Sequence, residues 1–188
     1  MIAETFEYMK EAEIALEAIK AAGLPSVVTM AILREGKTRC GVPPPEAMIA
    51  LRDHGATVVG LNCSRGPETM LPLLKDITAA VDGHPVAALP VAYRTSDEHP
   101  TFQSLTEDAE MKYCDLDPHT CTRFDIAAFT TEALGLGVQY FGVCCGGAPH
   151  HVRAMAQALR SIMESQRLFD EAGADADSDD GAVDEDSA

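Results

Sequence analysis

Three cysteines occupy positions at which their thiols could meet. Cys63 follows one short apolar run of the chain, and Cys144 and Cys145 follow another. Neighbouring side chains of a regular strand point to opposite faces, so the adjacent pair can face one metal ion only where the backbone leaves strand geometry. Glycines stand on both sides of the pair and give the backbone that freedom. The pattern predicts a metal site with three thiolate ligands.

Three protein ligands and one open position are typical of catalytic zinc. The open position suits a thiol substrate, because zinc lowers the pKa of a bound thiol and keeps it as thiolate at neutral pH. Three cysteine thiolates overcompensate the charge of Zn2+, so the substrate sulfur stays electron-rich enough to attack a methyl group. We therefore expect Zn2+ as the cofactor and an in-line displacement as the reaction.

Two other interpretations of these cysteines stay open at this point. A buried cysteine often serves as a small apolar packing residue, and an adjacent pair can form a vicinal disulfide. Cys40, Cys114 and Cys121 lack the glycine-flanked context at a strand end, so we do not expect them to bind metal. His150 and His151 open a helix, where capping or surface exposure is the simpler interpretation.

The cysteine-bearing runs belong to a chain in which strand and helix patterns alternate. The expected strands are 27–31, 57–62, 86–92 and 138–143, and the expected helices are 6–19, 43–51, 67–81, 125–134 and one that begins near 149. Apolar strands between amphipathic helices predict an α/β fold with a parallel sheet and helical cover.

Both a doubly wound sheet and part of a (β/α)8 TIM barrel fit this alternation. No GxGxxG motif follows any of the expected strands, which weakens a nucleotide-binding fold. Chemistry at the carboxyl ends of strands is typical of barrels, and the three cysteines stand at such ends. Glu4 becomes a further strand-end residue if Ile2 and Ala3 belong to a strand. Four strands and such a stub are too few to close an eight-stranded barrel.

Composition and charge limit the classes of protein to which this chain could belong. The 188 residues are enough for one domain with a core. Segment 170–188 holds nine carboxylates and no Lys or Arg, so we expect a domain over 1–169 followed by a disordered acidic tail. No basic patch supports nucleic-acid binding, and no apolar run is long enough to cross a membrane. The first residues show no secretory pattern, so we expect a cytoplasmic protein with reduced cysteines.

Several short segments resemble motifs of the homocysteine S-methyltransferase family, and of its betaine–homocysteine branch in particular. The most specific are Gly60-Leu61-Asn62-Cys63, similar to GxNC, and Gly142-Val143-Cys144-Cys145-Gly146, similar to GGCCG. Supporting segments are IAE at 2–4, GVPP at 41–44, LPVAYRT at 89–95, TRFDI at 122–126 and PHHVR at 149–153. The resemblance runs colinearly through residues 1–160.

The resemblance implies the second half of a (β/α)8 barrel that transfers a methyl group to homocysteine and yields methionine. It implies Cys63, Cys144 and Cys145 as zinc ligands, and Glu4 as the carboxylate that binds the amino group of homocysteine. Betaine or S-methylmethionine is the implied methyl donor. Thr5 stands where betaine-using members carry a tyrosine, which removes an aromatic partner for a quaternary ammonium.

Two roles stay open for such a chain. An active methyltransferase needs the first half of the barrel, from a longer chain or from a partner. The alternative is a catalytically inactive, truncated half-barrel that binds zinc. Open sheet edges tend to pair, so we expect a complementary half-barrel or a second copy of the chain as partner. Val143, which replaces a glycine of GGCCG, brings the local backbone geometry into question.

Overall fold

The structure is a computed structural model that describes residues 1–107 and 115–178, with side chains described through Glu171. Its strands are β1 Ile2–Phe6, β2 Val27–Met30, β3 Val58–Asn62, β4 Val86–Leu89 and β5 Tyr140–Phe141. Its helices are α1 Met9–Ala21, α2 Pro44–Asp53, α3 Pro67–Ala80, α4 Arg123–Gly135 and α5 Pro149–Ser178. Short 3-10 turns cover Ser104–Thr106 and Asp117–His119 in the connection between β4 and α4.

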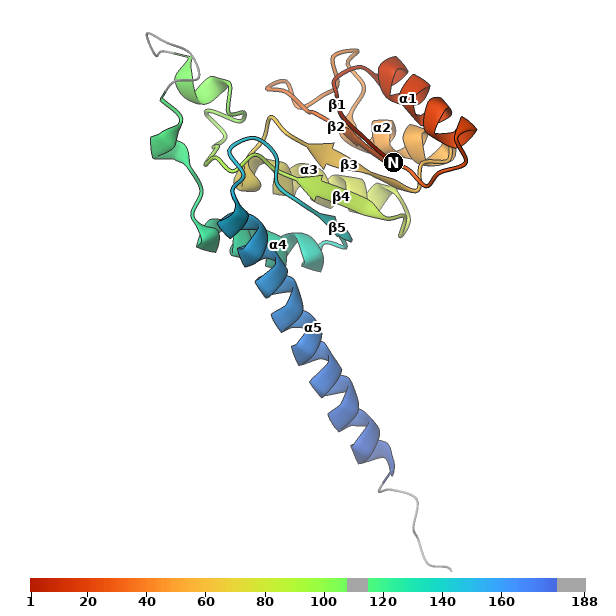
Figure 1. The fold of residues 1–188 in the computed structure, drawn as a ribbon, viewed down its shortest axis with the longest axis vertical. Helices are drawn as coiled ribbons and strands as arrows, with labels where there is room; N and C mark the ends of the chain where they lie inside the picture. Colours follow the sequence, from red (N-terminus) through yellow and green to blue (C-terminus); the bar gives the residue numbers. More distant parts are fainter. Residues whose placement is uncertain (108–114, 179–188) are drawn as a thin grey trace, which may run out of the picture.

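All strands are parallel and lie in the order β1-β2-β3-β4-β5 (Figure 1). Crossovers between parallel strands are almost always right-handed, so successive connections between neighbouring strands put their helices on one face of the sheet. Each helix accordingly packs against the next, from α1 to α5. The carboxyl ends of the strands share one edge of the sheet, so the loops that follow β1, β3 and β5 open on the same side of the molecule.

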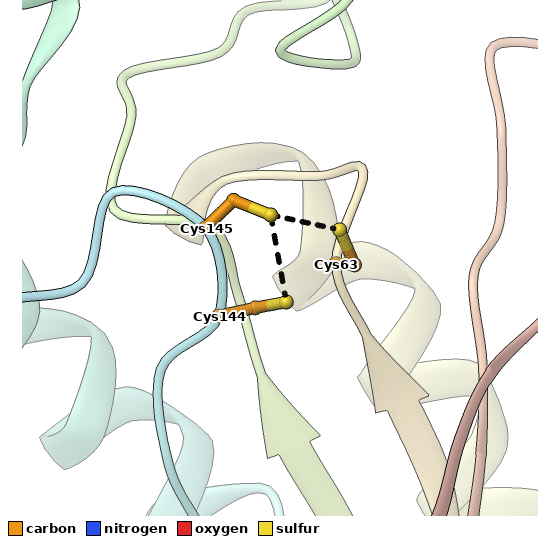
Figure 2. A group of neighbouring side chains, drawn as sticks. All are labelled: Cys63, Cys144 and Cys145. Carbon is orange, nitrogen blue, oxygen red and sulfur yellow. Dashed lines mark hydrogen bonds between the residues drawn. The ribbon is translucent and has the colours of Figure 1, made fainter.

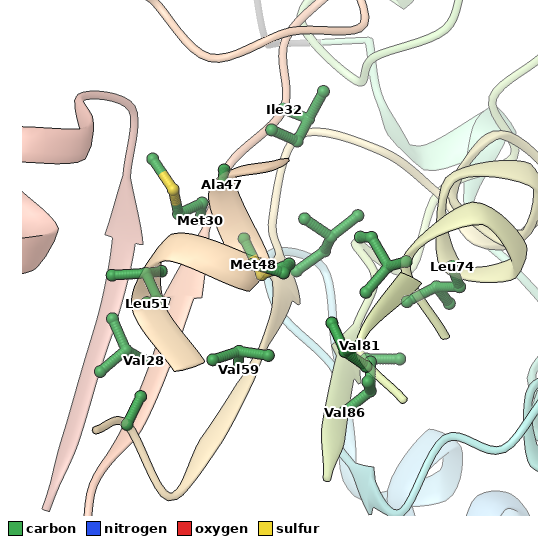
Figure 3. Packing of buried hydrophobic residues seen from close by; sticks show 14 of the residues in the cluster. Val28, Met30, Ile32, Ala47, Met48, Leu51, Val59, Leu74, Val81 and Val86 are labelled. Atoms are coloured by element: carbon green, nitrogen blue, oxygen red, sulfur yellow. The ribbon is translucent and has the colours of Figure 1, made fainter. Parts of the chain in front are cut away.

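The core lies between the helices and one face of the sheet. Side chains alternate across a strand, so every second strand residue faces the helices. Buried side chains from three strands, α2 and α3 pack together in Figure 3, among them Val28, Met30, Met48, Leu51, Val59, Leu74 and Val86. Burying one such side chain stabilises the fold by about 1.5–3 kcal/mol. Strand residues of the opposite parity, including Thr29 and Asn62, point to the other face.

The expected parallel α/β fold is confirmed, but several element limits differ from the expected ones. Phe6, expected in the first helix, is the last residue of β1, and α1 begins at Met9. β4 ends at Leu89 because Pro90 has no N–H to donate to the ladder. α4 begins at Arg123, before the expected start, because a capping box forms ahead of it. The Thr122 hydroxyl accepts a hydrogen bond from the Asp125 N–H, and the Asp125 carboxylate accepts one from the Thr122 N–H.

The two edge strands also differ from expectation. β1 is a strand of five residues rather than a stub, although its pairing with β2 shifts register between Ala3 and Phe6. β5 is reduced to Tyr140–Phe141 from the expected 138–143. These two strands end the sheet on either side, so each has one edge without a strand partner in the part of the chain that the structure describes.

The last helix extends away from the sheet (Figure 1). It continues to Ser178, beyond residue 169, after which we expected the acidic tail to begin. Residues 179–188 lie outside the described residues, so the disorder of that tail stays a prediction, and Cys114 lies outside them as well. Within the described ranges, none of the helices has the length and apolar character that a membrane span requires.

Candidate metal centre

Cys63 lies in a strained loop at the carboxyl end of β3. Its φ is +60°, and that of Ser64 is also +60°, in the left-handed region that residues with a side chain seldom adopt. The Cys63 N–H donates to the Leu89 carbonyl at 3.0 Å, and the Arg65 N–H donates to the Cys63 carbonyl at 2.7 Å. These bonds hold the buried thiol directly beyond the strand.

Cys144 and Cys145 lie in the loop that follows β5. The Cys144 N–H donates to the Pro90 carbonyl at 2.8 Å, which ties this loop to the end of β4. A turn then closes through the Gly147 N–H and the Cys144 carbonyl at 2.9 Å, with Gly146 at a φ of +74°. The backbone therefore leaves strand geometry at the pair, and both thiols point into the same space (Figure 2).

The three thiols converge on one point in Figure 2. Cys63 Sγ lies 3.6 Å from Cys145 Sγ, Cys144 Sγ lies 4.0 Å from Cys145 Sγ, and all three atoms lie within 4.8 Å of one another. Tetrahedral zinc with Zn–S bonds of about 2.3 Å separates its sulfur ligands by about 3.8 Å. The donor set and its spacing therefore fit a single zinc ion.

The three thiols of the cluster differ in pKa. The pKa of Cys144 is lowered to about 6, first through the Cys63 thiol and then through N–H donors that include Asn62, in opposition to burial. The pKa of Cys63 is raised by its interaction with Cys144 and by burial, and burial also raises the pKa of Cys145. Cys144 is therefore the thiol that ionises first, and the thiolate is the form that binds metal.

Asn62, the last residue of β3, connects the thiols to Glu4. Its Nδ2 donates to Glu4 Oε2 at 3.0 Å and to Cys144 Sγ at 3.9 Å. Asn62 is fully buried, whereas Glu4 is exposed. One amide group thus separates an exposed carboxylate from the sulfur cluster. Glu4 lies within β1 rather than at the strand end where we expected it, and Asn62 connects it to the residues expected to bind metal.

Arg65 is a buried cation that sequence reasoning did not single out. Its side chain donates from Nε to the Ile32 carbonyl at 3.1 Å and from Nη2 to the Leu33 carbonyl at 2.7 Å. Burial lowers the pKa of this guanidinium, and the carbonyl dipoles stabilise its charge in place of water. Arg65 thereby ties the loop after β2 to the loop that carries Cys63. The only signal in the sequence was a charged residue close to that thiol.

Other cysteines and histidines of the described residues lie outside the cluster. Cys40 is exposed and contacts the Thr38 hydroxyl at 3.4 Å. Cys121 is buried, and burial raises the pKa of its thiol to about 12. His151 is buried and its Nδ1 accepts a hydrogen bond from the Ala148 N–H at the start of α5, which confirms the expected capping role.

Valine fits the loop at position 143 without distortion. Among the described residues, Val143 is not one of the non-glycine residues whose φ is positive. Its side chain is half-buried and packs against the small cluster that contains Ile126 and Met155. Valine in place of glycine at position 143 therefore does not disturb the backbone, because this position needs no left-handed conformation.

Comparisons with known proteins point to one family. The family model described as Homocysteine S-methyltransferase matches residues 1–159. Betaine–homocysteine S-methyltransferase 1 of Mus musculus is 39% identical over 163 residues, covering 85% of this chain and 39% of the relative. S-methylmethionine–homocysteine S-methyltransferase BHMT2 of Rattus norvegicus is 37% identical over 165 residues, covering 85% and 44%. The chain spans about two fifths of the length of these curated relatives.

Solved structures show a similar fold. The apo form of the homocysteine methyltransferase MmuM from Escherichia coli aligns with a TM-score of 0.58 at 15% identity, over 84% of this chain and 48% of that one. Its metallated form aligns with a TM-score of 0.57 at 15% identity, over 82% and 43%. The family model covers most of the chain, including all three cysteines of the cluster. The chain therefore belongs to the homocysteine S-methyltransferase family.

Proposed function

We propose that this chain carries the zinc-binding part of a methyltransferase that moves a methyl group to the thiolate of homocysteine and gives methionine. The observation that carries the proposal is the convergence of Cys63, Cys144 and Cys145 within 4.8 Å, in a chain of this family. Thiolate ligands select soft or borderline metals, and zinc is the redox-inert member of that group.

The three cysteines would hold Zn2+ as thiolates. A zinc ion bound there supplies the Lewis acidity that lowers the pKa of a substrate thiol. Cys144 would lose its proton most readily, because the folded chain already lowers its pKa to about 6. Cys63 and Cys145, whose pKa values are raised, would release their protons as the metal binds, so the affinity for zinc should rise with pH.

Glu4 is the residue that we assign to the amino group of homocysteine. An exposed carboxylate attracts an ammonium group, and Asn62 holds one carboxylate oxygen at the edge of the sulfur cluster. A substrate held at both its sulfur and its nitrogen has little freedom to rotate. Its sulfur lone pair then faces the methyl donor, and such orientation contributes much of the rate in a displacement reaction.

The proposed reaction is balanced as a simple displacement. A lone pair of the homocysteine sulfur forms the new bond to the methyl carbon. The bond between that carbon and the positively charged nitrogen or sulfur of the donor breaks, and its electron pair stays on the leaving atom. The thiol proton has already gone to solvent. Betaine and S-methylmethionine both fit this chemistry. Thr5 has no aromatic ring that could contact the positive charge of either donor.

We also assign the five-stranded sheet to the second half of a (β/α)8 barrel. Parallel strands in sequential order with helices on one face are the arrangement of such a barrel, and five strands are too few to close it. The unpaired edges of β1 and β5 would join a complementary half-barrel or a second copy of this chain. The cytoplasmic location expected from the sequence stays a prediction.

The alternative is a half-barrel that binds zinc without turnover. Zinc-loaded chain is incubated with homocysteine and either betaine or S-methylmethionine, and methionine is quantified by mass spectrometry, with Cys144→Ser as the inactive control. Methionine from the wild-type chain alone, or after addition of a complementary half-barrel, supports the methyltransferase. Zinc binding without methionine in both settings supports the alternative, and a folded chain that binds no zinc overturns both.

A further inference from the structure

The buried amide of Asn62 is the centre of a hydrogen-bond network beside the thiol cluster. Its Oδ1 accepts from the Thr5 N–H at 2.9 Å and from the Thr29 hydroxyl at 2.8 Å. Its Nδ2 donates to the Thr5 hydroxyl at 2.6 Å and to Glu4 Oε2 at 3.0 Å, and it reaches Cys144 Sγ at 3.9 Å. Asn62 is fully buried and Thr29 is 1% exposed, whereas Thr5 and Glu4 are exposed, so the network runs from the interior to the surface.

The orientation of this amide is fixed by its partners. A backbone N–H can only donate, so the atom of Asn62 that faces the Thr5 N–H must be the carbonyl oxygen. The Thr29 hydroxyl then completes the carbonyl side. The NH2 group is left to face the Glu4 carboxylate and Cys144, both of which accept hydrogen bonds.

Asn62 also holds the irregular part of β1. Thr5 has a φ of +64°, a conformation that costs energy for a residue with a branched side chain. The register between β1 and β2 shifts between Ala3 and Phe6, around this residue. The Thr5 N–H bonds to the side chain of Asn62 rather than to the backbone of β2. One side chain from β3 thus stabilises the distortion that sets the position of the adjoining Glu4.

We propose that Asn62 is a positioning residue that makes the site select thiols with a neighbouring amino group. It fixes the distance between the carboxylate of Glu4 and the thiol cluster, so that a ligand bound through sulfur presents its ammonium to Glu4. This inference rests on the proposed function, because it requires a metal at the cysteines. Loss of a hydrogen bond to a charged group typically lowers affinity by roughly tenfold or more.

The test measures selectivity rather than turnover. Co2+ replaces zinc in the chain, and the absorption change on thiol binding gives dissociation constants for homocysteine and for 4-mercaptobutanoate, which lacks the amino group. We expect the wild-type chain to prefer homocysteine by about tenfold. Glu4→Gln and Asn62→Ala should each reduce this preference to about twofold or less. The preference is the ratio of the two dissociation constants in the same variant, so a change in metal affinity common to both thiols cancels. Glu4→Gln added to Asn62→Ala should cause no further loss.

Thr29→Val keeps the shape of its side chain and removes only the hydroxyl that orients Asn62. We expect an intermediate preference for homocysteine, whereas Thr130→Val, a buried threonine in α4 whose hydroxyl bonds to the Ile126 carbonyl, should leave the preference unchanged. If Asn62→Ala fails to bind Co2+, Thr29→Val decides whether Asn62 positions Glu4.

Each outcome bears on a different claim. A wild-type preference that Glu4→Gln abolishes but neither Asn62→Ala nor Thr29→Val alters would overturn the positioning role and leave the proposed function standing. Equal loss of affinity for both thiols in Asn62→Ala and Thr29→Val would show a merely structural role. A wild-type chain that binds neither Co2+ nor thiol would reject the proposed function, and this inference with it.

Discussion

Cys63 Sγ lies 3.6 Å from Cys145 Sγ, although 82 residues separate them in the sequence. Two separate backbone contacts with one strand produce this proximity, because Cys63 donates its N–H to Leu89 and Cys144 donates its N–H to Pro90. The end of β4 therefore serves as the common support for both cysteine loops. Since Pro90 also ends β4, the same short segment stops the strand and holds the loops in place.

Replacement of any one cysteine of the cluster should remove stoichiometric zinc binding. Cys63→Ser, Cys144→Ser and Cys145→Ser each delete one of three thiolates, and hydroxyl oxygen is a poor ligand for zinc. Cys40→Ser is the matched control, because Cys40 is exposed and lies outside the cluster. Zinc per chain after dialysis, measured by plasma mass spectrometry, should be near one for the control and near zero for the three variants.

Alkylation of the metal-free chain should modify Cys144 at a far lower pH than Cys121. Its thiol has a pKa lowered to about 6, so the reactive thiolate forms as pH rises through that value. Cys121, whose pKa is raised to about 12 by burial, should stay largely unmodified below pH 8. Iodoacetamide treatment across pH 5–8, followed by peptide mass spectrometry, should give half-maximal modification of Cys144 near pH 6. Added zinc should protect Cys144 and leave the reaction of exposed Cys40 unchanged, and equal modification of Cys144 and Cys121 would contradict the assignment.

The convergence of the three thiols could be expected from the sequence because of a property of parallel sheets. The carboxyl ends of parallel strands share one edge, so residues that follow different strands meet there even when strand limits are uncertain. β4 and β5 are shorter than the pattern indicated, yet Cys63, Cys144 and Cys145 still lie within 4.8 Å of one another. Their role as metal ligands stays a prediction.

The network around Asn62 could not be read from the sequence. An asparagine at the end of an apolar strand indicates only that a polar side chain lies there. The hydrogen-bond partners of Asn62 come from β1 and β2, which the sequence alone does not identify. The register shift in β1 and the left-handed conformation of Thr5 arise from those long-range contacts. Arg65 was missed for a similar reason, because its carbonyl partners belong to the distant loop after β2.

The capping box at the start of α4 should contribute measurably to stability. Thr122→Ala removes the hydroxyl that accepts the Asp125 N–H, and loss of such a cap typically costs about 1 kcal/mol of unfolding free energy. Urea denaturation followed by circular dichroism measures this difference. Thr131→Ala, which removes an exposed hydroxyl within the same helix that bonds to the Ala127 carbonyl, is the control and should change stability by less than about 0.5 kcal/mol.

The same capping box should make stability depend on pH in acid. Burial acts to raise the pKa of Asp125, but hydrogen bonds from Thr122 and the side chain of Arg94 outweigh it and lower that pKa below 3.8. Because the folded-state pKa is depressed, the carboxylate stabilises the fold above pH 3.8, and this contribution is lost as pH falls through the lower folded value. Asp125→Asn should therefore flatten the decline of unfolding free energy below pH 4, and an unchanged decline would count against the assigned ionisation.

The turn after Cys145 should tolerate no side chain at Gly146. This glycine has a φ of +74°, and a Cβ added to it would lie 2.6 Å from Cζ of the Tyr93 ring. Alanine in the left-handed region costs about 1–2 kcal/mol before the clash is counted, so Gly146→Ala should shift the adjoining thiols and weaken zinc binding by roughly tenfold or more. Gly135→Ala is the control, since Gly135 ends α4 with an ordinary φ and open space around its Cα, and alanine there should leave zinc affinity unchanged and raise helix stability slightly. Competition with a chromogenic chelator measures both affinities. Equal affinities in the two variants would mean that the cysteine loop adjusts freely, and that the backbone of this turn does not set the geometry of the cluster.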